Sequence, residues 1–282
     1  MHTIAKEIKI NDEVTIGGRR PFFLIGGPCV LENRDHSFSL AKEIRAICRE
    51  LGVPFIFKAS FDKANRSSID SYRGPGLEEG LLILKEIKRE LSLPVLSDVH
   101  EAHQIQKASE VLDVIQIPAL LCRQTDLITE AAGTGLPLNI KKGQFMSPLE
   151  VRNIAGKAAS QGNQNILLTE RGTVFGYQNL VFDVRSIPIL KSLGHPVIID
   201  ASHSVQKPGG EGSSSGGEAE FIPVIARAGI SVGCDGLYCE IHDRPEHALS
   251  DKHNSLNLNE LRGLLVALLK LKKTVDEINS SE

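Results

Sequence analysis

Short apolar runs recur along the chain, and each of them ends in polar residues. The runs that have the length of a strand are 22–30, 54–60, 94–99, 114–120, 137–143, 166–172, 196–203 and 236–242. Continuous apolar and β-branched residues, without polar alternation, are typical of strands that are buried on both faces of a parallel sheet. The pattern therefore predicts a buried parallel sheet whose strands end in polar side chains.

Segments with the helical spacing of apolar residues separate these runs. The clearest are 39–51, 77–91, 147–160 and, last in the chain, 258–278. Repeated strand–helix alternation predicts an α/β fold, a (β/α)8 TIM barrel, formed as a single domain by residues 1–282. An open doubly wound sheet is the alternative. Such sheets usually have fewer strands, and no Gly-x-Gly-x-x-Gly turn follows the first run.

Two segments fall outside this repeat. The pattern of residues 8–16 indicates a β-hairpin with its turn near Asn11 and Asp12, and we expect this N-terminal extension, residues 1–18, to cover the bottom of the barrel. Residues 207–217 are rich in glycine and serine and predict a flexible loop after the seventh strand. The loop is either a solvated linker or, at the catalytic end of a barrel, a mobile lid.

The composition disfavours several classes of protein. The formal net charge is -3 and tryptophan is absent, so neither a polyanion-binding surface nor a platform for base stacking is expected. We therefore expect no nucleic-acid partner. Without an apolar run of about eighteen residues or a cationic leader, the sequence also predicts no membrane span and no secretory signal.

The cysteines indicate a reducing compartment. They are odd in number and none forms a Cys-x-x-Cys pair: Cys29, Cys48, Cys122, Cys234 and Cys239. A disulfide framework is therefore disfavoured, and a cytoplasmic location is expected.

A dense set of polar residues marks the carboxyl ends of the predicted strands, where the active sites of such barrels lie. The set comprises Cys29, Lys58, Asp98, Gln116, Lys141, Lys142, Glu170, Arg171, Asp200, His203, Glu240 and His242. Any one of them is explained by a strand that ends in a polar residue. A titratable group at nearly every strand end favours a catalytic mouth instead.

Part of this set is cationic and is joined by cations of the neighbouring loops. These residues are Lys58, Lys63, Arg66, Arg73, Arg123, Lys141 and Arg171. Arginine and lysine bind phosphate and carboxylate groups. Their accumulation at one mouth of an acidic chain predicts a small substrate with more than one anionic group.

A second subset combines a thiol, an imidazole and two carboxylates: Cys29, His203, Glu240 and Asp251. This mixture of donors suits a divalent metal. The spacing along the chain is irregular and not specific for a metal. Three further histidines lie close by in the sequence as alternative ligands: His242, His247 and His253. The residues alone leave the metal site open.

Segment 58–68, KASFDKANRSS, carries a resemblance to a known family. The chain resembles the 3-deoxy-D-manno-octulosonate 8-phosphate synthases, also called KDO-8-phosphate synthases. The likeness covers nearly the whole chain, through segments 71–80, 97–101, 115–127, 139–148, 169–183 and 200–210. The motif KANRSS separates this family from the related DAHP and sialic acid synthases, which bind different aldehydes.

The resemblance implies a (β/α)8 barrel that assembles as a homotetramer and acts as a transferase. The implied reaction is an aldol-type condensation of phosphoenolpyruvate with D-arabinose 5-phosphate and water. It gives 3-deoxy-D-manno-octulosonate 8-phosphate and inorganic phosphate, and it supplies the KDO sugar of lipopolysaccharide. The alternatives are a DAHP synthase-like enzyme that uses another aldose, a metal hydrolase, and a non-catalytic barrel that only binds ligands.

The resemblance also implies which residues bind the substrates. They are Lys58, Lys63, Asn65, Arg66, Ser67, Arg123, Lys141 and Arg171. Of these, Lys141 and Arg171 would hold the phosphate of phosphoenolpyruvate. Lys58 and Lys63 would lie against its carboxylate and the aldehyde end of the pentose.

Residues 65–67 would contact arabinose 5-phosphate, and Arg123 would complete a phosphate site across a subunit boundary. The catalytic residues that we expect are Lys58, Lys63, Asp98, His203 and Asp251. The sequence does not rank the last three as proton donor or as the group that activates water.

Cys29 decides between two branches of the resembled family. One branch requires a divalent metal and has cysteine at this position, whereas the other has asparagine and needs no metal. Because the chain reads Gly27-Pro28-Cys29, the resemblance implies the metal-requiring branch, with Zn²⁺, Fe²⁺, Mn²⁺, Co²⁺ or a similar ion. A thiolate binds such borderline metals far better than an amide does. The implied ligands are Cys29, His203, Glu240 and Asp251.

Overall fold

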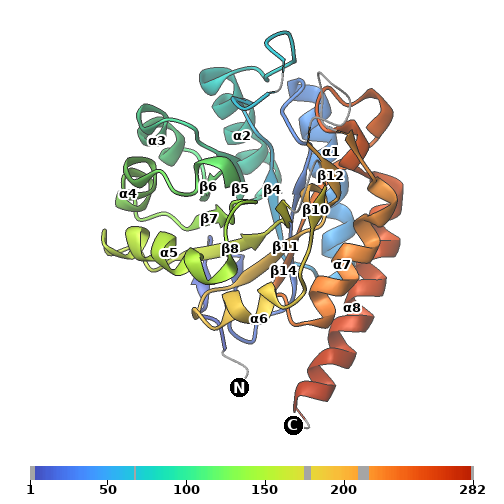
Figure 1. Ribbon diagram of the computed structural model, residues 1–282. Coiled ribbons are helices and arrows are strands. Elements are labelled where there is room, and N and C mark those ends of the chain that lie inside the picture. Colours follow the sequence, from blue (N-terminus) through green and yellow to red (C-terminus); the bar gives the residue numbers. More distant parts are fainter. Residues whose placement is uncertain (1–3, 67, 175–178, 209–215, 281–282) are drawn as a thin grey trace.

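The computed structural model describes residues 4–66, 68–174, 179–208 and 216–280. At its centre parallel strands form a closed barrel: β3 Phe23–Gly27, β4 Phe55–Lys58, β5 Val95–Asp98, β6 Val114–Ile117, β7 Leu138–Lys141, β8 Ile166–Glu170, β11 Val197–Asp200 and β14 Gly236–His242. Each strand pairs in parallel with the next, and β14 closes the ring by pairing with both β11 and β3 (Figure 1). The predicted (β/α)8 barrel is confirmed, and every predicted run forms one of its strands.

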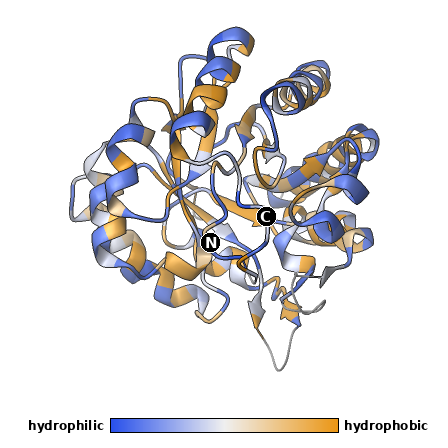
Figure 2. Cartoon of the chain, turned by 90° about the horizontal axis from the view of Figure 1, so that it is seen from above, coloured by the Kyte–Doolittle hydropathy of each residue, from blue (hydrophilic) through white to orange (hydrophobic). Residues whose placement is uncertain are grey.

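Helices surround the barrel (Figure 2). They are α1 Arg34–Leu51, α2 Leu77–Leu91, α3 Ala102–Ser109, α4 Thr125–Gly133, α5 Val151–Ala159, α6 Ser186–Lys191, α7 Ile222–Ser231 and α8 Leu258–Ser280. Each buries an apolar stripe, such as Leu84, Ile87 and Leu91 of α2, against the outer faces of the strands. The four segments predicted as helical correspond to α1, α2, α5 and α8.

Short elements connect these helices and strands. Single 3-10 turns are η1 Ala119–Leu121, η2 Pro148–Glu150, η3 His203–Val205, η4 Ala219–Phe221, η5 Pro245–His247 and η6 Lys252–Asn254. Antiparallel pairs form between β9 Thr173–Val174 and β10 Leu180–Val181, and between β12 Gln206–Lys207 and β13 Gly216–Gly217, while β15 Leu256–Asn257 lies beside β14. Most of the flexible loop predicted at 207–217 falls outside the described residues. None of the described helices is long and apolar enough to span a membrane.

The N-terminal hairpin closes the bottom of the barrel. Its strands, β1 Ile8–Lys9 and β2 Thr15–Ile16, pair antiparallel, and the side-chain oxygen of Asn11 accepts the N–H groups of Glu13 and Val14. Apolar hairpin side chains and inward-facing barrel residues form one buried cluster: Ile8, Ile10, Val14, Ile16, Phe23, Ile25, Ile56, Leu96, Val114, Leu167, Ile198 and Tyr238. The predicted hairpin and its place under the barrel are confirmed.

Candidate active site at the mouth of the barrel

The inward-facing side chains change from apolar to charged towards the carboxyl ends of the strands. On β4 Ile56 is followed two positions later by Lys58, and on β11 Ile198 is followed by Asp200. Residues two apart on a strand face the same way.

A cavity of about 410 Å³ opens at this end, which suits a small ligand. The predicted site residues that line it are Lys58, Lys63, Asn65, Arg66, Asp98, Lys141, Arg171, His203 and Asp251.

Lys58 and Asp98 belong to one buried network. The ammonium of Lys58 donates to the carbonyl oxygen of Cys29 (3.0 Å) and to the hydroxyl of Ser60 (2.9 Å). That hydroxyl in turn donates to Asp98 (2.5 Å). Burial acts to raise the pKa of the Asp98 carboxyl, but the charge of Lys58 and a hydrogen bond from His100 hold it well below its usual value. Asp98 is therefore an ionised proton acceptor.

Lys141 belongs to a second network. Its ammonium donates to the carboxylate of Asp200 (2.5 Å) and lies 3.4 Å from the ring centroid of Tyr238. Burial lowers the pKa of Lys141 to about 8, against the opposing effect of Asp200. The residue is thus a cation at neutral pH, fixed in place and facing the cavity.

Two guanidinium groups present free donors at the cavity. Arg171 donates through Nη2 to the carbonyl oxygen of His203 (2.9 Å). Arg66 donates through Nη1 to the hydroxyl of Ser250 (2.8 Å) and lies 3.7 Å from the Asp251 carboxylate. Within the part of the chain that the structure describes, both Nε atoms are buried without a hydrogen-bond partner. A buried unpaired donor is costly, so these two groups are suited to an anionic ligand.

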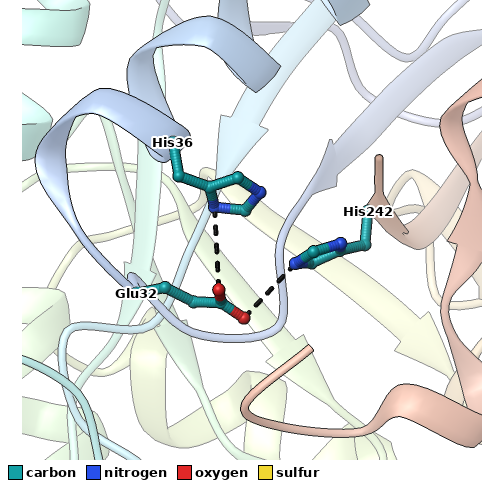
Figure 3. A group of neighbouring side chains, drawn as sticks. All are labelled: Glu32, His36 and His242. Atoms are coloured by element: carbon teal, nitrogen blue, oxygen red, sulfur yellow. Dashed lines mark hydrogen bonds and ion pairs between the residues drawn. The ribbon is translucent and has the colours of Figure 1, made fainter. Parts of the chain in front are cut away.

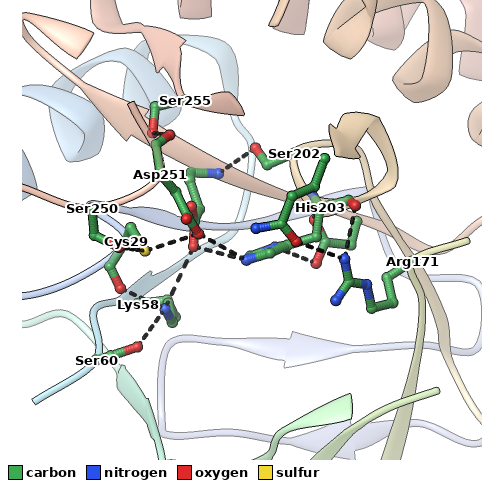
Figure 4. A network of polar contacts seen from close by, with 12 residues as sticks. Cys29, Lys58, Ser60, Arg171, Ser202, His203, Ser250, Asp251 and Ser255 are labelled. Atoms are coloured by element: carbon green, nitrogen blue, oxygen red, sulfur yellow. Dashed lines mark hydrogen bonds and ion pairs between the residues drawn. The ribbon is translucent and has the colours of Figure 1, made fainter. Parts of the chain in front are cut away.

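The four residues of the expected metal site lie close together, and Figure 4 shows three of them, Cys29, His203 and Asp251. The thiol of Cys29 lies 3.3 Å from Oδ2 of Asp251, and Nε2 of His203 lies 3.2 Å from Glu240 and 3.6 Å from Asp251. Nδ1 of His203 is 2.8 Å from Asp200. A carboxylate behind an imidazole in this way orients its other nitrogen for a metal.

The chemistry of these donors fits a divalent cation. Both carboxylate oxygens of Glu240 are buried and have no hydrogen-bond partner among the described residues, which is a costly arrangement for an ionised group. The nearby ammonium groups of Lys58 and Lys63 offset part of this charge from 3.9 Å. Burial, together with the charge of Asp251, raises the pKa of the Cys29 thiol well above its ordinary value. A cation bound here would therefore displace the thiol proton.

Sequence periodicity could have revealed further residues of the mouth. Tyr238 precedes Glu240 by two positions and shares its inward face, yet composition alone marks it only as a core aromatic. Gln116, which the sequence already places at a strand end, lines the cavity as well. Its side-chain oxygen accepts from the amide of Asn139 (3.0 Å), whose own oxygen accepts from the hydroxyl of Thr169 (2.6 Å). This belt crosses β6, β7 and β8 and holds their ends in register.

Lys142 has a different environment from its neighbour Lys141. It is buried outside the cavity, and its ammonium donates to the carbonyl oxygens of Gly143 and Gly172 (both 3.2 Å) and to the hydroxyl of Thr173 (3.1 Å). These contacts join the loops that follow β7 and β8. Lys142 therefore positions the backbone beside Lys141 rather than facing a ligand.

Some predicted residues lie apart from the cavity or outside the described residues. Ser67 is outside the described residues. Arg123 is exposed after η1 and does not line the cavity of the single chain, so its role across a subunit boundary stays a prediction. Arg73 is half-exposed and pairs with Asp62 (2.5 Å). Of the alternative histidine ligands, His242 belongs to a separate cluster, described below.

The sequence of the chain is similar to those of known proteins over nearly its full length. Residues 5–277 match the model of the DAHP synthetase I family. The 2-dehydro-3-deoxyphosphooctonate aldolase of Geotalea uraniireducens is 54% identical over 275 residues, which are 98% of this chain and 99% of the relative. The proteins of the same name from Pelobacter propionicus and a Cyanothece species are 53% and 52% identical, over 98% and 94% of this chain and 99% and 97% of the relatives.

Proposed function

The chain belongs to the DAHP synthetase I family, and from this premise we propose that it condenses phosphoenolpyruvate with D-arabinose 5-phosphate and water. The products are 3-deoxy-D-manno-octulosonate 8-phosphate, a precursor of lipopolysaccharide, and inorganic phosphate. The observation that carries the proposal is identity above 50%, over nearly full length, to relatives named for an octonate product. An eight-carbon acid needs a five-carbon aldose beside the three carbons of phosphoenolpyruvate, which disfavours the four-carbon substrate of the alternative.

The cations of the mouth suit this substrate pair. Two anionic molecules repel each other, and fixed positive groups offset that repulsion while holding the reacting carbons in contact. Lys141 and Arg171 would bind the phosphate of phosphoenolpyruvate, and Lys58 and Lys63 its carboxylate and the aldehyde end of the pentose. Arg66, with its free Nε, would bind the pentose phosphate.

The reaction requires two bonds to form and one to break. Carbon 3 of phosphoenolpyruvate attacks the aldehyde carbon, and the aldehyde oxygen takes up a proton. Water adds at carbon 2, and cleavage of the carbon–oxygen bond releases phosphate. The ionised carboxylates of Asp98 and Asp251 would accept the proton from water, and Lys63 would donate a proton to the aldehyde oxygen. His203, whose Nε2 faces Glu240 and Asp251, would act through the metal site proposed below.

A direct test compares two aldoses in one assay. Purified protein is incubated with phosphoenolpyruvate and either D-arabinose 5-phosphate or D-erythrose 4-phosphate, and phosphate release and product mass are measured. We expect turnover with the pentose and an eight-carbon product. Preferential turnover of the tetrose would instead support the DAHP synthase-like enzyme, and binding heat without turnover would support the non-catalytic barrel.

We extend the proposal to a divalent metal held by Cys29, His203, Glu240 and Asp251. The proposal is supported by the buried carboxylate of Glu240, which has no hydrogen-bond partner among the described residues, and by its closeness to Cys29 and Asp251. Nε2 of His203 lies 3.2 Å from the same carboxylate. When bound, the ion would act as a Lewis acid or as a template for the reactants. Without it, the described contacts of the Glu240 carboxylate are the ammonium groups of Lys58 and Lys63, both 3.9 Å away, and the imidazole of His203 at 3.2 Å.

Substitutions of Cys29 test the metal proposal. We expect Cys29→Ala to lose bound metal, measured by elemental analysis, and to stay inactive at ordinary metal concentrations. Partial activity of Cys29→Asn without metal would be consistent with the metal proposal, because the metal-free branch of the resembled family carries asparagine at this position. A Cys29→Ala protein that retains the metal content and activity of the unmodified chain would contradict the proposal.

We further propose a cytoplasmic homotetramer. All five cysteines are free, which suits a reducing compartment. Apolar side chains near the mouth are half-exposed, among them Leu120, Phe145 and Leu149, and a partner subunit would cover such a surface. Light scattering of the purified protein gives its mass in solution, and a monomeric mass would overturn this assembly.

A further inference from the structure

A second cluster of metal-ligating side chains lies beside the mouth and takes no part in the proposed reaction. Glu32 follows β3, His36 lies in the first turn of α1, and His242 is the last residue of β14 (Figure 3). The geometry points to a second divalent transition-metal site formed by these three residues.

The three side chains converge on one point. One donor atom from each residue lies within 4.8 Å of the donors from the other two. Nε2 of His242 is 3.3 Å from Oε1 of Glu32, and Nδ1 of His36 is 4.0 Å from Oε2 of the same carboxylate. The two imidazole rings lie 4.6 Å apart between centroids. An ion between them would have ligands from two separate segments of the chain, Glu32 and His36 from one and His242 from the other.

One potential metal-ligating nitrogen of the cluster makes no hydrogen bond. Nδ1 of His36 is buried and has no hydrogen-bond partner among the described residues. Its other ring nitrogen, Nε2, lies 2.9 Å from Oδ1 of Asp243, which fixes the proton there and leaves the lone pair of Nδ1 facing Glu32. This carboxylate–imidazole pair is the arrangement that orients a metal-binding histidine.

Glu32 is prepared to act as an anionic ligand. Its Oε1 accepts the N–H of Leu249 (2.8 Å), which fixes the orientation of the carboxylate. Burial acts to raise its pKa, but hydrogen bonds from His242 and from Leu249 hold the pKa below the ordinary value. The side chain is about 13% exposed, so an ion can reach it from solvent.

Ion binding requires one proton to move on His242. With Nε2 donating to Glu32, its Nδ1 accepts the N–H of Arg244 (2.9 Å). A metal on Nε2 displaces that proton, and the neutral ring then carries a proton on Nδ1 instead. Oδ1 of Asp243 lies 3.1 Å from Nδ1 and can accept a hydrogen bond from it. The N–H of Arg244 loses its acceptor in this form. The site is therefore expected to bind more weakly than the thiolate-containing site.

The donor set selects the class of ion. Two imidazoles and one carboxylate are the ligands of zinc and of other first-row divalent metals, whereas calcium and magnesium prefer oxygen donors alone. The cluster joins β3 and α1 to β14, and Glu32 holds the loop that leads to Ser250 and Asp251. A bound ion would stabilise this part of the mouth.

Zinc titration of metal-free protein tests the site without reading activity. The variant Cys29→Ala weakens the first site, so the remaining zinc is counted in that background after removal of any affinity tag. We expect one equivalent in Cys29→Ala and none in Cys29→Ala combined with His36→Asn. The matched control, Cys29→Ala with His103→Asn, keeps one equivalent because His103 is an exposed histidine on α3.

Two further measurements guard against misfolding and against loose binding. Zinc is expected to raise the melting temperature of Cys29→Ala but not of its His36→Asn derivative, and both metal-free proteins are expected to give the same circular dichroism spectrum. Anomalous scattering at the zinc edge, from crystals of the unmodified chain, should show an ion between His36 and His242. Equal zinc binding by both Cys29→Ala derivatives, or the absence of that anomalous peak, would overturn the second site.

Discussion

The two ends of one barrel differ in what their inward-facing side chains do. At the bottom, hairpin residues such as Ile16 pack on Phe23 and Ile198 in a continuous apolar cluster. At the mouth, strands of the same barrel present Lys141 and Asp200, buried but charged. Burial of apolar groups stabilises a fold, whereas burial of charges costs free energy unless each is paired. The bottom therefore stabilises the fold, whereas the mouth holds reactive charged groups whose burial lowers stability.

The largest effect on stability is expected at the bottom. Ile16→Ala removes a fully buried side chain of the hairpin, and such a change costs about 2–5 kcal/mol of unfolding free energy. We expect a lower denaturation midpoint with an unchanged kcat/KM for the folded protein. Ile4→Ala is the control, because Ile4 is largely exposed. A loss of kcat/KM with no loss of stability would break the division between the two ends.

At the mouth we expect the opposite result, a loss of kcat/KM with unchanged stability. Arg171→Ala removes a charge-assisted contact to phosphate, worth about 1.5–3 kcal/mol, or roughly 10- to 150-fold in kcat/KM. The melting temperature should stay the same. Arg185→Ala, which removes an exposed guanidinium paired with Asp183, should change neither quantity. Loss of activity only in proportion to unfolded protein would show a structural role instead.

Lys141→Ala is also expected to lose activity, but here a buried ion pair is broken. Its ammonium lies in a buried pair with Asp200, so removal leaves the Asp200 carboxylate paired with the imidazole of His203. We expect turnover to fall as for Arg171→Ala, with an intact circular dichroism spectrum. Retained turnover would show that Lys141 does not bind the phosphate of phosphoenolpyruvate.

Arg66→Ala should separate the two substrates. We expect the Michaelis constant for arabinose 5-phosphate to rise roughly 10-fold or more, since a charge-assisted phosphate contact is worth about 1.5 kcal/mol at least. The constant for phosphoenolpyruvate should change much less. Equal rises for both would show that Arg66 acts through its contacts with Ser250 and Asp251.

The smallest effect is expected from a histidine at the bottom. Burial, aided by the charge of Lys6, lowers the pKa of His195 below its ordinary value. The unfolded chain therefore binds more protons near pH 6, so stability is full above the ordinary pKa and falls as the pH drops through it. His195→Gln should flatten this dependence in denaturant titrations between neutral and mildly acidic pH. An unchanged pH slope would contradict the assignment.

The strands could be predicted from sequence because each is an unbroken apolar run that ends in polar residues. Strand periodicity also places Lys58 and Lys141 at the mouth. It equally places Tyr238 there, but an aromatic residue in an apolar run carries no signal of a polar role. The environment of Lys142 depends on two loops that follow different strands, and no local pattern records it.

The two proposed sets of metal ligands could be predicted only in part. Cys29 and Asp251 are brought together when β14 pairs with β3, and this closure follows from the barrel prediction. The resemblance supplied the choice of ligands, because the spacing alone left other histidines open. The cluster of Glu32, His36 and His242 has no motif, and it emerges only from side-chain directions in the folded chain.

We propose that the mouth works through a bound divalent ion, whereas the rest of the barrel holds its shape without one. Phosphate release from phosphoenolpyruvate and arabinose 5-phosphate is measured before and after thorough chelation, beside elemental analysis and thermal melting of the same samples. We predict that chelation abolishes phosphate release, that Mn²⁺ or a similar ion restores it, and that the metal-free protein remains folded. Full activity in protein shown by elemental analysis to hold no metal would contradict the account.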